Sequence, residues 1–337
     1  MKVLTIIVPC FNVEKYLHKT LQSFICKEDY MKQLEVLIIN DGSTDGTESV
    51  ANEFVSAHPS TFSLLNKPNG GHGSTINSGL RLATGKYTKI IDGDDWAEEG
   101  SVPALIDELK KTDVDAVLTN YKTFNMVTEE VIPYPFPKTY TAYGNELSWP
   151  EHIPAVPHFT LCTACFNTQY LKSLDFTLQE NTFYVDEEYI FFTLSNIKTW
   201  KYTNIYLYVY LIGNTQQSIS IKNRIGRLDH YHRVICRLVE YVRSHTNVRT
   251  DRPYCLDRLV TLVTTYYLLC LIYHPDREIG KHLAAELHKN ISDIQELRAK
   301  SNRKYKVFLI MHNIHISGNM YDCLSNCKML KFLHAKY

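Results

Sequence analysis

The chain has 337 residues, 45% of them hydrophobic, which is enough to bury the core of one large domain or two modest ones. Its formal net charge is zero, but residues 221–337 carry 20 Lys and Arg against 10 Asp and Glu, so the first 220 residues are acidic. The nine cysteines are scattered and odd in number, and Met1-Lys2 runs straight into an apolar segment, so we expect a cytoplasmic protein with neither a disulfide framework nor a signal peptide.

Short apolar runs alternate with amphipathic segments over the N-terminal part of the chain. Apolar runs of strand length occur at residues 4–9, 35–40, 62–65, 87–91 and 116–119. In the first intervening segment Leu17 and Leu21 recur at helical spacing, and Asn12 is expected to cap that helix. Strands joined by such helices predict an α/β fold with a mostly parallel, Rossmann-like sheet, which binds ligands beyond the carboxyl ends of its strands.

Polar motifs follow three of these strands. Pro9 ends the first strand, Asp41 follows the second, and the tetrad Asp92-Gly93-Asp94-Asp95 follows the fourth. Clustered carboxylates repel one another and are costly to desolvate, and a divalent cation bound to a diphosphate would relieve that cost. An isolated acidic tetrad is more often a solvated turn, but three motifs at one edge of a sheet favour a metal–diphosphate site.

A glycine-rich stretch, Asn69–Ser74, opens the helix before the fourth strand. Its glycines, Gly71 among them, would let backbone N–H groups approach a ligand, and a helix N-terminus favours negative charge. Asp41 is expected to accept hydrogen bonds from a base N–H or a ribose hydroxyl. The stretch is not a dinucleotide fingerprint, which would need glycine or alanine at Ile76, and Gly79–Lys86 is not a P-loop because it follows a helix.

The last third of the chain is mainly helical and follows an aromatic, strand-like run at residues 205–212. The apolar run 256–273 approaches the length of a membrane span, but Arg258 and the many Thr and Tyr residues predict a buried or interfacial helix. The basic region 300–337 either contacts an anionic membrane or packs against the acidic half of the chain.

The combination of motifs resembles the family 2 inverting glycosyltransferases with the GT-A fold. The resemblance rests on four segments: LTIIVPCFN, VLIINDGSTDGT, NGGHGSTINSGLRLATGKYTKIIDGDDW and FYVDEEYIFF. It implies a GT-A nucleotide-sugar-binding and catalytic domain over residues 1–220, with a basic, mainly helical region over residues 221–337. It also implies transfer of a hexosyl group, with inversion, from a nucleotide sugar such as a UDP-sugar to an acceptor hydroxyl in surface polysaccharide or glycolipid assembly.

The resemblance assigns residues to the donor site one by one. It places Pro9 and Phe11 beside the uracil or equivalent base, and Asp41 also on the nucleoside. It adds Gly71, Asp92 and Asp95 to the residues that bind the nucleotide sugar. Each of these residues follows a predicted strand or opens a predicted helix, so the assignment agrees with the sheet edge expected above.

The resemblance also assigns the metal site and the general base. Asp92 and Asp94 take the D-x-D positions that bind Mn²⁺ or Mg²⁺, with Asp94 the main ligand. Asp186 takes the position of the general base. Val185 replaces the Glu that precedes the base in the family, so Glu188 stays open as an alternative base.

Some features leave alternatives open. Ile76 stands where many relatives have Arg, so His72 or Lys67 would replace that Arg. A sugar nucleotidyltransferase and a catalytically silent nucleotide-sugar binder remain the competing functions. The expected partners are a nucleotide-sugar donor and a glycan or lipid-linked acceptor, with peripheral contact to the inner face of the cell membrane and no nucleic acid.

Overall fold

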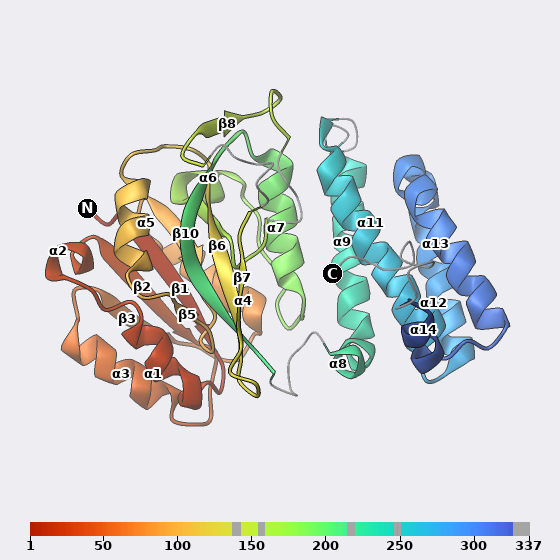
Figure 1. Ribbon diagram of the computed structural model, residues 1–337, viewed down its shortest axis with the longest axis horizontal. Coiled ribbons are helices and arrows are strands. Elements are labelled where there is room, and N and C mark those ends of the chain that lie inside the picture. Colours follow the sequence, from red (N-terminus) through yellow and green to blue (C-terminus); the bar gives the residue numbers. More distant parts are fainter. Residues whose placement is uncertain (137–142, 154–158, 214–219, 246–247, 249–250, 326–337) are drawn as a thin grey trace. The chain divides into compact units, whose positions relative to one another are not determined.

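A computed structural model describes residues 1–136, 143–153, 159–213, 220–245, 248 and 251–325. The chain forms two compact units, Met1–Asn214 and Thr215–Tyr337 (Figure 1). The end of the basic region, residues 326–337, lies outside the described residues. The first unit contains every residue predicted to bind the donor, the metal or the acceptor.

Four parallel strands form one side of the sheet in the first unit. They are β1 (Leu4–Cys10), β2 (Leu34–Asn40), β3 (Phe62–Asn66) and β4 (Tyr87–Ile90), in the order β3-β2-β1-β4. All seven residues of β1 are buried. A parallel strand covered on both faces reads as a continuous apolar run, which is why the sequence predicted these strands to within two residues.

The other side of the sheet mixes strand directions. The order continues through β9 (Ala164–Asn167), β6 (Ala116–Asn125), β10 (Thr199–Ile212) and β5 (Trp96–Ala97), while β7 (Val131–Tyr134) pairs with β6 and β8 (Glu146–Ser148) pairs with β10. β10 runs parallel to β6, whereas β9 runs antiparallel to both of its neighbours, β4 and β6. β6, which contains the fifth predicted strand of the chain, is therefore separated from β4 by β9.

Helices cover both faces of this sheet. The helices are α1 (Glu14–Gln22), α2 (Glu28–Met31), α3 (Thr47–Ala57), α4 (His72–Leu82), α5 (Ser101–Leu109), α6 (Thr168–Ser173) and α7 (Val185–Asn196). Apolar residues of α1, α3 and α5 form one core with β1 and β2, and α4 contacts β1, α6 and α7. The α/β fold class predicted from the sequence is confirmed.

The predicted helix cap at Asn12 is wrong. α1 begins at Glu14 after Val13, and no side chain caps it. The Asn12 side chain instead accepts a hydrogen bond from the backbone N–H of Thr44 at 2.9 Å. Asn12 therefore joins the end of β1 to the loop after β2. The N–H of Thr44 in that loop takes the place of the helix N–H that a capping Asn12 would have bound.

The second unit is helical over its described residues. Its elements are α8 (Ile221–Gly226), α9 (Leu228–Ser244), α11 (Pro253–Leu268), the π-helix η3 (Leu269–Tyr273), α12 (Arg277–Asn290), the 3₁₀-helix η4 (Ile291–Asp293), α13 (Gln295–Asn313) and α14 (Gly318–Ser325). By length and composition, one helix among the described residues, Pro253–Tyr273, is long and apolar enough to cross a membrane, and 78% of its most apolar window is buried in the unit. It therefore forms the core of this unit, as a buried helix was predicted to do.

Candidate active site

The carboxyl ends of β1, β2 and β4 lie side by side, as the three polar motifs predicted. The backbone N–H of Asp41 donates to the carbonyl of Cys10 at 2.9 Å, and that of Gly93 donates to the carbonyl of Pro9 at 3.1 Å. Any Cβ at Gly93 would lie 3.0 Å from the Pro9 carbonyl oxygen. Glycine therefore lets the acidic tetrad approach the end of β1 closely.

The buried carboxylate of Asp41 binds the backbone of the glycine-rich stretch. Its carboxylate is 2% exposed. One oxygen accepts hydrogen bonds from the Lys67 ammonium at 2.6 Å and from the Gly70 N–H at 3.0 Å, and the other accepts from the Gly71 N–H at 2.7 Å. The N–H groups of these two glycines were expected to face a ligand, but they point at Asp41. Contact between Asp41 and a nucleoside remains a prediction.

Asp92 is held from two directions. One oxygen lies 2.9 Å from Nε2 of His72, and the other accepts a hydrogen bond from the Tyr208 hydroxyl at 3.2 Å. Burial raises the pKa of Asp92, but the charge of His72 and the hydrogen bonds of His72 and Tyr208 outweigh it and bring the pKa below its ordinary value. His72 and Lys67, the two candidates to replace the missing Arg, therefore each pair with an acidic residue of the donor site.

Asp95 is held inside the protein. It is 1% exposed, and its oxygens accept hydrogen bonds from the Leu211 N–H at 2.7 Å and the Tyr208 hydroxyl at 2.5 Å. Burial and the charges of Asp94 and Asp92 raise its pKa well above the ordinary value. Asp95 thus fixes β10 against the acidic tetrad, because its oxygens satisfy buried donors. Contact between Asp95 and a nucleotide sugar remains a prediction.

Asp94 is the carboxylate of the tetrad best suited to a cation. Burial and the repulsion of Asp92 outweigh the attraction of His72 and raise the pKa of Asp94 to about 6. No three His, Cys, Asp or Glu side chains form a complete metal site in the part of the chain that the structure describes. Mg²⁺ and Mn²⁺ commonly take one or two carboxylates and complete their shell with phosphate oxygens, so Asp94 with Asp92 fits a cation that arrives with a diphosphate.

Asp186 lies in the first turn of α7. Burial lowers the pKa of His72, but the charges of Asp92, Asp186 and Asp94 raise it above the ordinary value, so all three carboxylates lie within electrostatic range of this imidazole. A helix N-terminus favours a carboxylate, so this position suits a charged Asp186. The role of Asp186 as the base remains a prediction.

Glu188, the alternative base, is buried. It is fully inaccessible, and its two oxygens accept hydrogen bonds from the backbone N–H of Gln179 at 3.1 Å and from the side-chain amide of Gln179. A carboxylate in this position cannot meet an acceptor hydroxyl without breaking those bonds. The arrangement favours Asp186 as the base.

The remaining predicted donor residues differ in exposure. Phe11 is 50% exposed just beyond β1, where its ring is accessible to a base. Pro9 is buried in β1. Gly71 has a φ of +81°, a conformation that L-residues rarely adopt, and precedes α4 directly. Direct contact of these residues with a donor remains a prediction.

Two residues that the sequence analysis did not single out, Lys89 and Tyr208, bind buried groups next to the site. Lys89 of β4 is fully buried, and its ammonium donates to the carbonyls of Leu161, Cys162 and Ala164 at 2.5, 2.9 and 3.1 Å. Burial lowers its pKa to about 8. A lysine inside an apolar strand is a signal that sequence reading can detect. Tyr208 offers none, because its partners are more than 110 residues away in the sequence.

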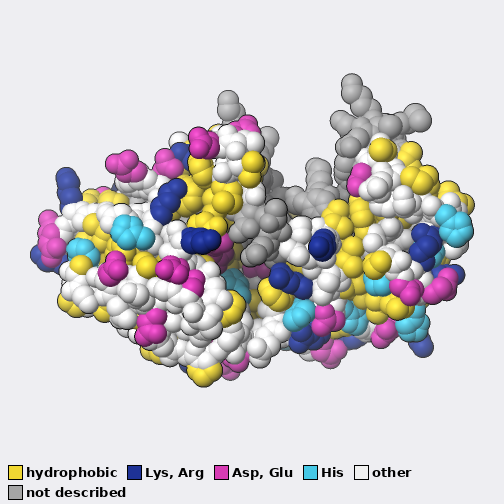
Figure 2. All heavy atoms as spheres, turned by 90° about the horizontal axis from the view of Figure 1, so that it is seen from below, with side chains coloured by type: hydrophobic (Ala, Val, Ile, Leu, Met, Phe, Trp, Pro, Cys, Tyr) yellow, Lys and Arg dark blue, Asp and Glu magenta, His cyan; other side chains and the backbone are white. Residues whose placement is uncertain are grey.

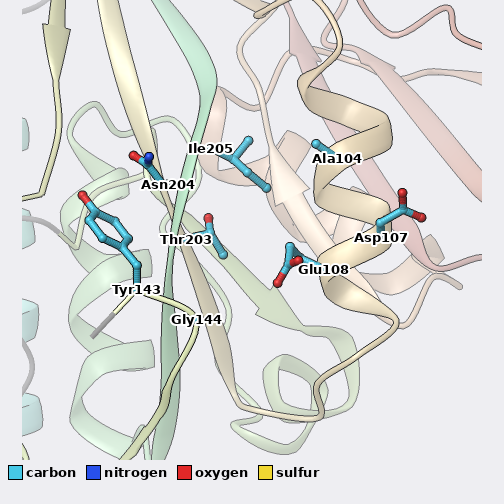
Figure 3. A pocket seen from close by; sticks show the side chains of 8 residues that line it. All are labelled: Ala104, Asp107, Glu108, Tyr143, Gly144, Thr203, Asn204 and Ile205. Atoms are coloured by element: carbon cyan, nitrogen blue, oxygen red, sulfur yellow. The ribbon is translucent and has the colours of Figure 1, made fainter. Parts of the chain in front are cut away.

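A separate hollow lies on the other part of the sheet. It has a volume of about 510 Å³ and is lined by residues of α5 and β10 together with Tyr143 and Gly144 (Figure 3). None of its eight lining residues belongs to the acidic tetrad, the glycine-rich stretch or α7. This hollow is therefore distinct from the acidic tetrad, and we assign it no part in the site.

Comparison with known proteins identifies the family of the first unit. A family model described as Glycosyl transferase family 2 matches residues 5–174. Glycosyltransferase GlyA of Streptococcus pneumoniae is 35% identical over 122 residues, which cover 36% of this chain and 17% of that protein. Minor teichoic acid biosynthesis protein GgaB of Bacillus subtilis is 30% identical over 115 residues, which cover 34% of this chain and 13% of that protein. The match thus spans less than a fifth of either relative.

A solved structure supports the fold. The structure of S. aureus TarS 1-349 in complex with UDP-GlcNAc aligns with a TM-score of 0.58 and 15% sequence identity, covering 94% of this chain and 93% of that one. At this identity the likeness establishes the fold, a GT-A sheet followed by a helical C-terminal region. Since the family model covers half of the sequence and the sheet carries the family's acidic motifs at one edge, the chain belongs to glycosyl transferase family 2.

Proposed function

We propose that this protein is an inverting glycosyltransferase that moves a hexosyl group from a UDP-sugar to an acceptor hydroxyl. The observation that carries the proposal is the acidic tetrad at the carboxyl ends of β1, β2 and β4, with the charge of Asp186 acting on the same imidazole, His72, that pairs with Asp92. Family membership supports a nucleotide-sugar donor. The UDP-GlcNAc complex of TarS and the teichoic acid role in the name of GgaB support a UDP-sugar and a surface polysaccharide or glycolipid as product.

The proposed reaction is a single displacement. Asp186 accepts the proton of the acceptor hydroxyl as its oxygen attacks the anomeric carbon on the face opposite the diphosphate. The bond to the nucleoside diphosphate breaks as the new glycosidic bond forms, so the configuration inverts. A positioned carboxylate base contributes about 10²–10⁴-fold to the rate.

The donor side needs charge compensation at the leaving group. Asp94, with Asp92, would hold a Mn²⁺ or Mg²⁺ ion, which when bound neutralises the charge that develops on the departing diphosphate. His72 holds Asp92 in place at 2.9 Å, and Asp41 holds the glycine-rich stretch at the start of α4. These contacts keep the carboxylates and the helix N-terminus in a fixed arrangement before a donor binds.

The substitution Asp186→Asn tests the proposed function. It removes the proton acceptor and keeps the side-chain shape, so we expect turnover of a UDP-sugar panel to fall about 10²–10⁴-fold. Binding of UDP in the presence of Mn²⁺, measured by calorimetry, should stay within about threefold of the wild-type value because the base does not contact the nucleotide. Glu187→Gln, at the neighbouring position, is the control and should stay active. Wild-type turnover in Asp186→Asn would reject the proposed mechanism.

We also propose that the protein works in the cytoplasm at the inner face of the cell membrane, on a glycan or lipid-linked acceptor. The second unit carries a net positive charge, with 20 Lys and Arg against 10 Asp and Glu from residue 215 onward. Anionic lipid headgroups attract such a surface. Binding to anionic vesicles at low salt measures this attachment.

A further inference from the structure

A short segment before α7 joins the donor side of the site to the acceptor side. We call residues Leu178–Thr182 the strap. The side chain of Asn77, in α4, accepts a hydrogen bond from the Leu178 N–H at 2.9 Å and donates to the Leu178 carbonyl at 3.0 Å. The N–H of Asn181 donates to the carbonyl of Gly70 at 2.6 Å. The strap is thus bound to the glycine-rich stretch and to the helix that this stretch begins.

Close packing fixes the strap against the same stretch. An added Cβ at Gly73 would lie 2.2 Å from the carbonyl oxygen of Gln179, and one at Gly71 would lie 3.2 Å from the backbone nitrogen of Asn181. No real Cβ atom approaches a carbonyl oxygen as closely as the first distance. The glycines at 71 and 73 therefore leave the room that the strap needs beside α4.

Glu188 fixes the strap to α7. Both of its oxygens accept hydrogen bonds from Gln179, at the centre of the strap. Glu188 lies two residues after Asp186, about 200° further around the helix, so the two carboxylates face different directions. A rotation or slide of α7 that moved Asp186 would break the bonds of Glu188.

We propose that Glu188 is a positioning residue that sets where Asp186 stands relative to the donor loop. The contacts form a continuous chain, from Asp186 along α7 to Glu188, and from there through Gln179 and the strap to Gly70 in the glycine-rich stretch. This inference rests on the proposed role of Asp186 as base. It gives the buried carboxylate a function in catalysis without contact to substrate.

This chain of contacts matters because a reacting group must be placed within a fraction of an ångström. A misplacement of about 1 Å by a substitution away from the reacting atoms can lower the rate about 10²-fold. Nucleotide binding is expected to depend on Phe11, Asp41 and the acidic tetrad, and not on α7. Loss of Glu188 should therefore reduce kcat far more than it weakens UDP binding.

Two substitutions of Glu188 separate positioning from proton transfer. Glu188→Gln keeps both hydrogen bonds, because its amide oxygen accepts from the Gln179 N–H and its NH₂ group donates to the Gln179 side chain once that amide flips. Glu188→Ala removes both bonds. We expect Glu188→Gln to retain kcat within about threefold of wild type, and Glu188→Ala to lose about 10²-fold in kcat with the UDP dissociation constant, in Mn²⁺, changed less than about threefold.

Hydrogen exchange of the protein without ligand tests the strap independently of any reaction. Amides of residues 178–182 should exchange faster in Glu188→Ala than in the wild type and stay protected in Glu188→Gln. Thr193→Val serves as the control, because it removes a buried hydroxyl that bonds only within α7, to the carbonyls of Tyr189 and Ile190. This control should lose stability without losing kcat or strap protection.

The outcomes distinguish this inference from the proposed function. An inactive Glu188→Gln would make Glu188 the base and overturn the positioning role. Wild-type kcat or unchanged exchange in Glu188→Ala would overturn it as well, as would a kcat in Thr193→Val that falls as far as in Glu188→Ala. An active Asp186→Asn, by contrast, would reject the proposed base while leaving the exchange result of the strap intact.

Discussion

The hydroxyl of Tyr208 lies between two carboxylates of the acidic tetrad. It is 3.2 Å from Asp92 and 2.5 Å from Asp95, and Asp95 also accepts the Leu211 N–H. Asp95 is almost fully buried, so each lost donor leaves a carboxylate oxygen without a partner. A single hydroxyl thus helps to hold Asp95 inside the protein, whereas Asp94 remains half-buried at the edge of the sheet.

The substitution Tyr208→Phe should destabilise the first unit by about 1–3 kcal/mol, because it removes the only donor from one oxygen of Asp95 among the described residues. Urea unfolding followed by circular dichroism measures this loss. Tyr210→Phe, two residues along β10, is the matched control and should change the free energy of unfolding by less than about 0.5 kcal/mol. Equal effects of the two substitutions would contradict the role given to Tyr208.

The buried Lys89 predicts a pH dependence of stability. Its pKa falls from the ordinary 10.5 to about 8 because burial disfavours the charge. Between pH 8 and 10.5 the unfolded chain therefore binds a proton that the folded chain has lost, so this residue makes the free energy of unfolding rise with pH. Below pH 8 both states are protonated and the contribution is constant.

Comparison of the wild type with Lys89→Met isolates this effect. Urea unfolding at pH 7 to 10 should show the wild type gaining stability relative to the variant above pH 8. Burial raises the pKa of Cys162 and also that of Cys165, to about 12, but both thiols are present in both proteins and their contributions cancel. Lys110→Met, at an exposed position, is the control. Parallel curves for the wild type and Lys89→Met would contradict the lowered pKa.

At the scale of elements, the sequence predicts the parallel strands well because they are buried on both faces. β1 and β2 read as largely apolar runs, β4 is buried although it contains Lys89, and the carboxyl ends of all three carry the polar motifs. β9 was not predicted, since its four residues follow no periodicity that distinguishes a strand from other buried chain. The pairing of β9 with β4 and β6 depends on contacts between distant parts of the chain, which no local sequence pattern reveals.

The same distinction holds for the site. The acidic motifs and the family resemblance were sufficient to name Asp92, Asp94 and Asp186, and the charges of all three act on His72 in the structure. Burial distinguishes two candidate bases that the local sequence cannot. Glu188 is a carboxylate only two residues from Asp186, and it lies inside the protein. Its partner Gln179 lies before the helix, in a segment without regular structure.

The contact between α4 and the strap predicts a stability effect at Gly73. In Gly73→Ala the new Cβ would lie 2.2 Å from the Gln179 carbonyl oxygen, so the helix or the strap must move. We expect a loss of about 1–3 kcal/mol in the free energy of unfolding, although alanine favours a helix more than glycine does. Gly226→Ala, at the end of α8 with no atom within 4 Å of the new Cβ, is the control. A more stable Gly73→Ala variant would contradict the packing.

At the scale of the whole molecule, charge is divided between the two units. The second unit has a net charge of +10 and the first a net charge of −10 at neutral pH. On the face shown in Figure 2, basic, acidic and apolar side chains are interspersed. Attraction to an anionic surface therefore comes from the net charge of a unit more than from one patch, and salt should screen it readily.

This division predicts salt-sensitive binding to membranes. The protein should co-sediment with phosphatidylserine-containing vesicles at low ionic strength and be released at about 0.5 M salt, where the Debye length is only a few ångströms. Phosphatidylcholine vesicles are the control and should not retain it. Sedimentation that responds to neither salt nor lipid charge would contradict electrostatic attachment.

The saturated carboxylate of Asp41 has a kinetic consequence for the encounter with a nucleoside. Lys67 and two backbone N–H groups already occupy its oxygens, so an incoming base or ribose that bonds with Asp41 must first displace one of these donors. Association would then proceed through a local rearrangement after collision, and the observed rate would level off as the nucleotide concentration rises. Stopped-flow mixing with UDP would record that plateau, whereas a rate that stays linear would mean that the nucleoside leaves the Lys67–Asp41 pair untouched.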